Sequence, residues 1–207
     1  MANLSILYAQ KHRHYHDITH IQNCLAEFEA YRSDNKDNVT IDEANVVTTA
    51  IWYHDAVYNP YSKLNEFESS NLVPFSNKGP FRAVREIVIL TKDHLINIDW
   101  DNLPTDALEE EWMITAAKVM LDIDLAGFGK SWEEYSHNSN HIRKEYYNTN
   151  DFDFCKGRLA FLTAMQKRQQ AAGTIYYTPY FNDKYNELAR RNIKTDIEVT
   201  KYYLKKC

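Results

Sequence analysis

Apolar residues along this chain recur at intervals of three and four, the spacing of helices that each bury one face. Between residues 18 and 31 the apolar positions on one such face are Ile18, Ile21, Leu25 and Phe28. Asp17 stands directly before them, where a side chain that caps the first turn is expected. This segment is therefore predicted to be an amphipathic helix.

The same signals, apolar spacing and capping residues, predict helices along most of the chain. "TIDE", Thr40 to Glu43, matches a capping box and predicts a helix that continues to about His54, with Asn59 and Pro60 as a stop signal. Further helices are predicted near Leu64 and over residues 80–94, 107–125, 132–147, 151–170 and 182–204. Strand-type alternation is nowhere sustained. We expect an all-α bundle of roughly eight helices that forms a single domain over residues 1–207.

Charge and composition narrow the classes of partner. The 24 basic and 29 acidic residues give a net charge of −5 without a broad basic field, so a nucleic-acid duplex is not an expected partner. No run approaches the roughly 18 apolar residues of a membrane span, and no signal-peptide core is seen. The three cysteines, Cys24, Cys155 and Cys207, lie far apart in the sequence and form no CxxC motif. This pattern is typical of reduced thiols. These features favour a cytoplasmic protein.

The stretch "AIWYHDAVYNP" places His54 and Asp55 inside an apolar run. A buried carboxylate costs several kcal/mol unless it is paired or bound to a metal ion. Two other segments bring metal-type ligands into apolar surroundings, namely "HRHYHDITHI" and "VMLDIDLAGFG". The ligand-type residues in these two segments are His12, His14, His16, His20, Asp122 and Asp124.

Each of these three segments also has a simpler interpretation. Histidines near a terminus are often solvated, a His-Asp doublet arises by chance, and two aspartates can close a helix. Their combination favours a site, because facing helices of a bundle bring inward side chains to one point. A mixed set of imidazoles and carboxylates suits Mn²⁺, Fe²⁺, Co²⁺, Ni²⁺ or Zn²⁺ better than Ca²⁺. Such an ion activates water and polarises a substrate oxygen, and phosphate esters are natural substrates for that chemistry.

The order H…HD…D on an all-α chain resembles the HD superfamily of metal-dependent phosphohydrolases. The segments that carry the resemblance are "HRHYHDITHIQNCL", "AIWYHDAVYNP", "NEFESS", "ILTKDH", "LDIDLAGFG", "IRKEY" and "ARRNI", between His12 and Ile193. The resemblance implies a metal site formed by His20, His54, Asp55 and Asp124. Asp122 would then support a ligand or close the helix.

The resemblance also suggests roles for residues around the metal. Glu66 is a candidate for positioning or deprotonating the attacking water, or is one more exposed helical acid. Lys92 is a candidate phosphate ligand, and His94 would protonate a leaving oxygen or hold a second metal. Both can equally lie on an exposed helix end. His16, four residues before His20, would support that ligand or contact the substrate.

Two arginines complete the candidate substrate site. Arg143 and Arg158 can clamp phosphate, or can instead pair with Glu145 or cap a helix. The tyrosine-rich segment 175–181 can form a lid or a homodimer contact, or simply pack against the bundle. No GxxxxGK[ST] or GxGxxG motif is present, so the small phosphorylated substrate stays unnamed.

Three functions are compatible with this pattern. The first is a stand-alone metal-dependent phosphohydrolase that cleaves a small phosphate ester, such as a nucleotide. The second is a non-catalytic module that keeps the metal pocket and senses a phosphorylated metabolite. The third is metal-assisted oxidation with O₂ at two irons, which needs additional histidine ligands such as His16 and His94.

Overall fold

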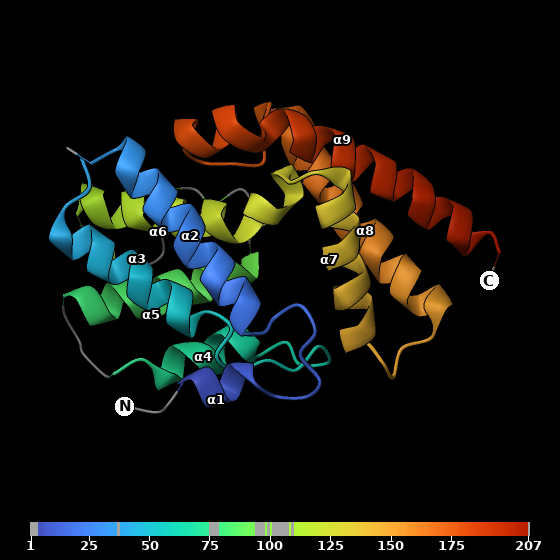
Figure 1. The fold of residues 1–207 in the computed structure, drawn as a ribbon, viewed down its shortest axis with the longest axis horizontal. Coiled ribbons are helices and arrows are strands. Elements are labelled where there is room, and N and C mark those ends of the chain that lie inside the picture. The colour runs from blue at the N-terminus through green and yellow to red at the C-terminus, as the bar shows by residue number, and fades with distance from the viewer. Residues whose placement is uncertain are drawn as a thin grey trace. The chain divides into compact units, whose positions relative to one another are not determined.

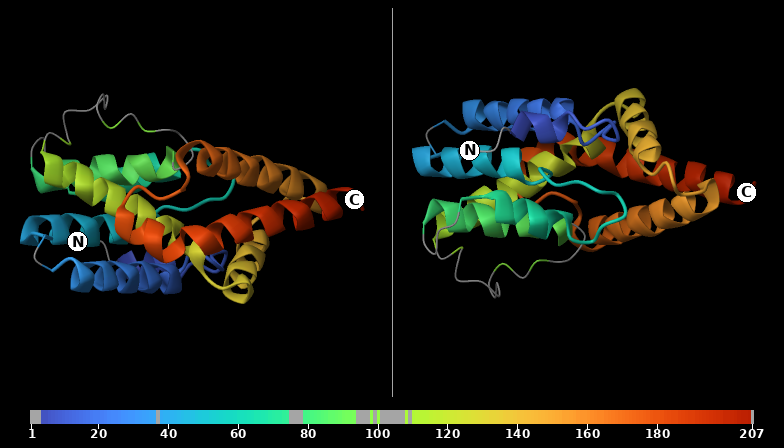
Figure 2. Two further views of the ribbon diagram at one scale, coloured as in Figure 1. Left: turned by 90° about the horizontal axis from the view of Figure 1, so that it is seen from above. Right: turned by 90° about the horizontal axis from the view of Figure 1, so that it is seen from below.

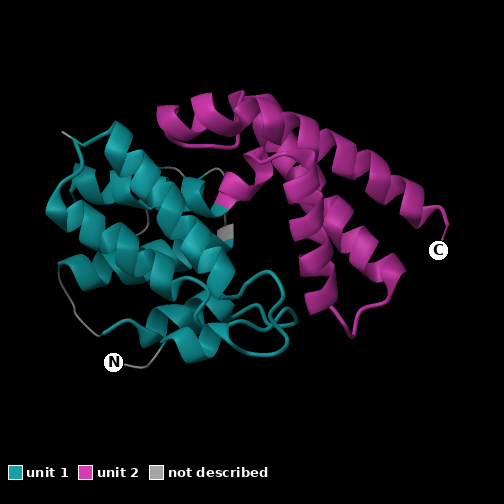
Figure 3. Ribbon diagram, viewed as in Figure 1, with its two compact units in different colours: residues 1–124 teal, residues 125–207 magenta. Residues whose placement is uncertain are grey.

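The computed structural model describes residues 4–36, 38–74, 79–93, 98, 100, 108 and 110–206 of the chain. These residues form nine α-helices and short 3₁₀ turns, with no strand among them (Figure 1). The expected all-α bundle of about eight helices is confirmed. The chain divides into two compact units, Met1–Asp124 and Leu125–Cys207 (Figure 3). The expectation that the two units belong to one domain stays a prediction.

The first unit is built from six helices. They are α1 (Leu4–Tyr8), α2 (Ile18–Asp34), α3 (Ile41–Tyr53), α4 (Asn65–Leu72), α5 (Pro80–Leu90) and α6 (Glu111–Leu125), whose last residue lies past the unit boundary. Helix α3 contacts α2, α4 and α5, and it lies between α2 and α5 (Figure 2). Its Val47 and Ile51 are fully buried, as are Ile21 of α2 and Ile87 of α5. This apolar core holds the helix ends that carry the candidate site.

The second unit contains a 3₁₀ turn, η3 (Ala126–Gly129), followed by α7 (Trp132–Glu145), α8 (Asp151–Ala172) and α9 (Pro179–Leu204). Helices α8 and α9 pack against each other, and α9 also packs against η3. Gly129 is required in that contact, because a β-carbon there would overlap the ring of Tyr185. Tyr176 and Phe181 are buried in this unit, so the packing interpretation of segment 175–181 holds for them.

Local capping signals explain where several helices begin. The Asp17 carboxylate accepts hydrogen bonds from the backbone of Thr19 and His20, and Thr40 Oγ1 accepts one from the backbone of Glu43. Both caps are therefore confirmed. Helix α1 was not predicted, and its five residues are too few for a periodic pattern. No described helix is both long and apolar enough to cross a bilayer.

Candidate metal centre

Three helix ends supply the candidate ligands. His20 lies in the first turn of α2, where the Asp17 cap fixes the backbone. His54 is the residue at which α3 ends, so the following Asp55 leaves the helical path. Asp124 is the last residue but one of α6. Adjacent residues inside a helix diverge by about 100°, and the end of α3 at His54 is what lets both members of the doublet face one point.

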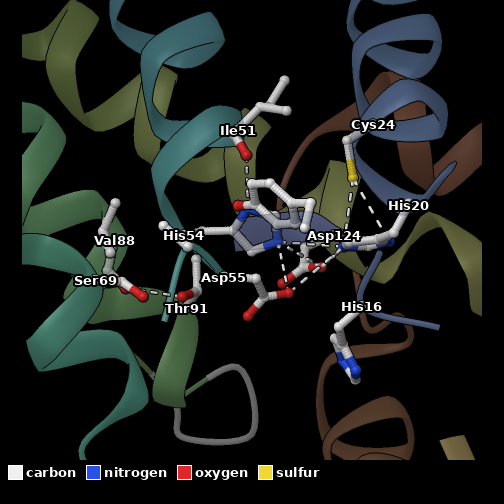
Figure 4. Close-up of polar contacts among 12 residues, drawn as sticks. His16, His20, Cys24, Ile51, His54, Asp55, Ser69, Val88, Thr91 and Asp124 are labelled. Carbon is white, nitrogen blue, oxygen red and sulfur yellow. Dashed lines mark hydrogen bonds and ion pairs between the residues drawn. The ribbon is translucent and has the colours of Figure 1, made fainter. Parts of the chain in front are cut away.

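The four side chains converge (Figure 4). Nε2 of His20 lies 3.2 Å from Nε2 of His54 and 3.2 Å from Oδ1 of Asp124. Nε2 of His54 lies 3.6 Å from the same Asp124 oxygen and 3.1 Å from Oδ2 of Asp55. The Asp55 oxygen is also 3.8 Å from Nε2 of His20. The sequence therefore identified a set of residues that the fold brings together.

These separations fit ligands of one cation. Metal–nitrogen and metal–oxygen bonds of about 2.0–2.2 Å place neighbouring ligand atoms about 3.0–3.5 Å apart at tetrahedral or octahedral angles. The donor atoms of His20, His54 and Asp124 all lie within 4.8 Å of one another. Asp55 is outside that tight group of three, although its Oδ2 contacts both imidazoles. We therefore regard Asp55 as the ligand that needs the largest adjustment.

The tautomer of His54 is set by its own helix. Its Nδ1 lies 2.9 Å from the backbone carbonyl oxygen of Ile51, which can only accept a hydrogen bond. The Nδ1 atom therefore carries a proton, so in the neutral ring the lone pair is on Nε2, the nitrogen that faces the other three candidate ligands. A hydrogen bond from the far ring nitrogen to a carbonyl is the usual support of a metal-binding histidine.

The electrostatics of the centre favour a positive charge. Burial alone lowers the pKa of His54, but the carboxylates of Asp55 and Asp124 outweigh it and raise that pKa well above its ordinary value. Burial likewise raises the pKa of Asp55, and the adjacent His54 imidazole reverses this effect, so the pKa of Asp55 is lowered. Two carboxylates thus lie beside an imidazole that is shielded from solvent. The negative potential that favours a proton on this imidazole would also favour a metal cation.

The two imidazoles of the centre are more deeply buried than the two carboxylates. The side chains of His20 and His54 are 5% and 1% exposed, whereas those of Asp55 and Asp124 are 16% and 17% exposed. Solvent or a small ligand can therefore approach the carboxylates. The buried imidazoles anchor the cluster from within the core.

Arg13 supports the doublet and was not identified from the sequence. Its guanidinium group donates hydrogen bonds to the carbonyl oxygens of Asp55 at 2.7 Å, Ala56 at 2.9 Å and His16 at 2.8 Å. The side chain is buried and lies over the rings of Tyr8 and Tyr58. Arg13 thereby ties the turn that contains Asp55 to the segment before α2.

Helix α4 holds the same turn from the other side. Ser69 Oγ accepts a hydrogen bond from the Val57 backbone nitrogen and donates to the Val57 carbonyl. Asn65 likewise accepts from the Asn59 nitrogen and donates to the Asn59 carbonyl. The "NEFESS" segment thus has a structural role in fixing the loop after the doublet, whereas Glu66 is half-buried in the first turn of α4.

Cys24 lies beside the imidazole of His20. Its Sγ is 3.6 Å from Nε2 and 3.9 Å from Nδ1 of that ring, one helical turn away on α2. Burial, followed by the charges of Asp124 and Asp55, raises the pKa of the Cys24 thiol well above its ordinary value. The sulfur is therefore a protonated packing group against the first ligand.

The other residues that the sequence predicted near the site lie in different surroundings. The His16 ring stacks on Tyr58 with centroids 4.2 Å apart and meets the His20 ring edge-on at 5.9 Å. Lys92 is exposed on the 3₁₀ turn Thr91–Asp93 after α5. His94 lies outside the described residues. Asp122 is fully buried, two residues before the candidate ligand Asp124.

The two predicted phosphate-binding arginines belong to the second unit, and both are engaged there. Arg143 pairs with Asp151 at 2.6 Å and donates to the carbonyl oxygens of Tyr146 and Thr149 after α7. Arg158 pairs with Asp196 at 2.7 Å. The expected alternative is a pair with Glu145 or a helix cap. The ion pairs seen are instead with Asp151 and Asp196, and Arg143 also binds carbonyl oxygens that follow α7. Their role toward a substrate stays a prediction.

Comparisons of the chain with models of known protein families, with curated proteins and with solved structures found no match. The functional interpretation therefore depends on the geometry of the site and on the sequence motifs alone.

Proposed function

We propose that the chain is a metal-dependent phosphohydrolase of the HD type, which cleaves a small phosphate ester by means of metal-activated water. The observation that carries the proposal is the convergence of His20, His54, Asp55 and Asp124 at separations of 3.1–3.8 Å. These four residues would hold one divalent transition-metal ion. Mn²⁺, Fe²⁺, Co²⁺, Ni²⁺ and Zn²⁺ all accept such a ligand set.

A divalent ion held by these ligands would lower the pKa of a water molecule and polarise a phosphoryl oxygen. Two features of the site favour this chemistry. The Ile51 carbonyl keeps His54 in the tautomer that exposes Nε2. The two carboxylates carry the negative charge that attracts the ion, and their partial exposure leaves an approach for the substrate.

Residues around this centre would bind the substrate. His16 lies against His20 and is half-buried, so its ring nitrogens are candidates for a hydrogen bond to a phosphate oxygen. Lys92 is exposed and carries a mobile positive charge. Glu66 remains the candidate for orienting water. Each assignment extends the proposal beyond the four ligands.

The exposure of Asp55 and Asp124 favours hydrolysis over a purely structural metal site, in which protein ligands fill every position. A binding module for a phosphorylated metabolite would share the open site but would not turn over an ester. Oxidation at two irons would need further histidine ligands. His16 is one candidate for that role, and its ring stacks on the ring of Tyr58.

The test is a screen of purified full-length protein against phosphate monoesters, phosphodiesters and nucleotides, with Mn²⁺, Co²⁺ or Ni²⁺ added. We expect turnover above the metal-only blank for at least one class, and its loss in Asp55→Asn. Asp42→Asn, an exposed change in the first turn of α3, is the matched control and should retain activity. Metal binding without turnover of any ester would favour the binding module instead.

A further inference from the structure

We propose that α7 carries a second cation site, separate from the centre described above, formed by His137 and His141. The two histidines are four residues apart, so they lie on the same face of the helix, one turn above the other. Their ring centroids are 4.2 Å apart, with planes inclined at 52°. Two imidazoles at this spacing on a helix are a known arrangement for binding zinc.

The ring separation can be compared with that of the two histidines in the first unit. The His20 and His54 centroids are 5.3 Å apart while their Nε2 atoms approach to 3.2 Å. The rings of His137 and His141 are already closer than that. Rotation about their side-chain bonds would direct one nitrogen of each toward a shared ion, as in helices that bind zinc through two histidines four residues apart.

A carboxylate stands in the same row of the helix. Glu133 precedes His137 by four residues and is exposed in the first turn of α7. Helical side chains lean toward the N-terminus, so His141 lies over the turn of His137, and His137 over that of Glu133. The row therefore offers two nitrogen ligands and one oxygen ligand. That set suits Zn²⁺, Ni²⁺ and Cu²⁺, which bind imidazole well.

The site is open to its ligand. His137 is exposed and His141 is half-buried, so an ion can arrive from solvent without any rearrangement of the core. The proposal does not depend on the phosphohydrolase assignment, because none of its residues belongs to the first unit. A bound ion would cross-link two turns of α7 and would stabilise that helix by mass action.

Protection of the histidines from carbethoxylation by diethylpyrocarbonate tests the proposal in the intact chain. Cleavage after Lys130 and Arg143 releases the peptide SWEEYSHNSNHIR, which contains His137 and His141 and no other histidine. Mass spectrometry of this peptide therefore reports on the α7 pair alone. At a Zn²⁺ concentration about ten times the dissociation constant, we expect modification to slow by about tenfold.

The control exchanges two neighbours. The double variant Ser136→His/His137→Ser keeps the composition but puts the histidines five residues apart, which turns them away from each other by about 140°. We expect Zn²⁺ to protect the wild-type peptide and to leave the variant peptide unprotected. Absence of protection in the wild type, or equal protection in the variant, would overturn the proposal. Neither outcome depends on whether the protein hydrolyses phosphate esters.

Discussion

The guanidinium group of Arg13 donates a hydrogen bond of 2.7 Å to the backbone carbonyl oxygen of Asp55. This contact joins the segment before α2 to the turn after α3. That turn contains Asp55, a candidate metal ligand. Two further carbonyl oxygens, those of Ala56 and His16, accept from the same group. The backbone that carries the Asp55 side chain is thus held by a residue that would not touch the metal.

Replacing Arg13 by methionine should weaken metal binding. The change removes the two hydrogen bonds to the turn, at Asp55 and Ala56, and the one to His16, while keeping an apolar side chain of similar length. Loss of such supporting contacts commonly lowers metal affinity by about 10–100-fold. Isothermal titration with Mn²⁺ would measure the change. Arg32→Met, on the exposed face of α2, is the matched control, and an equal loss of affinity in that variant would contradict the positioning role.

The thiol of Cys24 should be much less reactive than that of Cys155. Cys24 is 2% exposed, and burial together with nearby carboxylates raises its pKa, so little thiolate forms at pH 8. Cys155 is partly exposed on α8. Alkylation with iodoacetamide followed by peptide mapping should therefore label Cys155 before Cys24. Equal rates of labelling would show that the core around His20 opens to solvent.

Glu43→Gln should stabilise the protein at neutral pH. Burial raises the pKa of Glu43 above its ordinary value of 4.5, and Oε1 has no hydrogen-bond partner among the described residues. Because the folded-state pKa is raised, the carboxyl group contributes most favourably below pH 4.5, and this contribution is lost as the pH rises through the raised value.

Glutamine does not titrate, so the variant should have a higher free energy of unfolding at pH 7, by about 1 kcal/mol. The difference should shrink at pH 4. Urea unfolding at the two pH values measures this. A variant that is less stable than wild type at pH 7 would mean that the charge of Glu43 is favourable in the folded state.

Arg158→Met should destabilise the second unit. Arg158 and Asp196 are 12% and 11% exposed, and the same carboxylate also accepts a hydrogen bond of 2.7 Å from the Tyr135 hydroxyl. Removing Arg158 leaves the shielded Asp196 carboxylate without its counter-ion, which costs about 3–5 kcal/mol. Thermal and urea unfolding would detect this loss.

The control for that change is Arg191→Met, which removes an exposed pair with Glu187 and should alter stability by less than about 1 kcal/mol. The result also separates two roles for Arg158. If stability were unchanged and KM for a phosphate ester rose, the guanidinium group would serve the substrate rather than the fold.

The parts of the fold that could be predicted are those encoded locally. Asp17 and Thr40 cap helices through backbone atoms two or three residues away, so a short window contains the whole signal. The candidate ligands His54 and Asp55 could be identified because they are polar residues inside an apolar run. The packing of a helical bundle predicted that they would meet ligands from two other segments. The choice of His20 and Asp124 among the candidates in those segments came from the resemblance to the HD superfamily.

Contacts between distant backbone atoms could not be predicted in the same way. Arg13 binds carbonyl oxygens that lie 42 and 43 residues further along the chain, and every residue carries such an oxygen. Arg158 posed a related problem, because its partner Asp196 is 38 residues away. Nothing in the local sequence distinguishes a buried ion pair from a phosphate clamp.

The most direct test of the account is a titration of the purified protein with Mn²⁺, followed by the electron paramagnetic resonance signal of the free ion. Mn²⁺ is the appropriate probe because an imidazole pair such as that on α7 binds it weakly. We predict uptake of one Mn²⁺ per wild-type chain and no uptake by Asp124→Ala, with helical content retained in circular dichroism. Uptake by Asp124→Ala with wild-type affinity, or none by the wild type, would contradict a metal centre at His20, His54, Asp55 and Asp124.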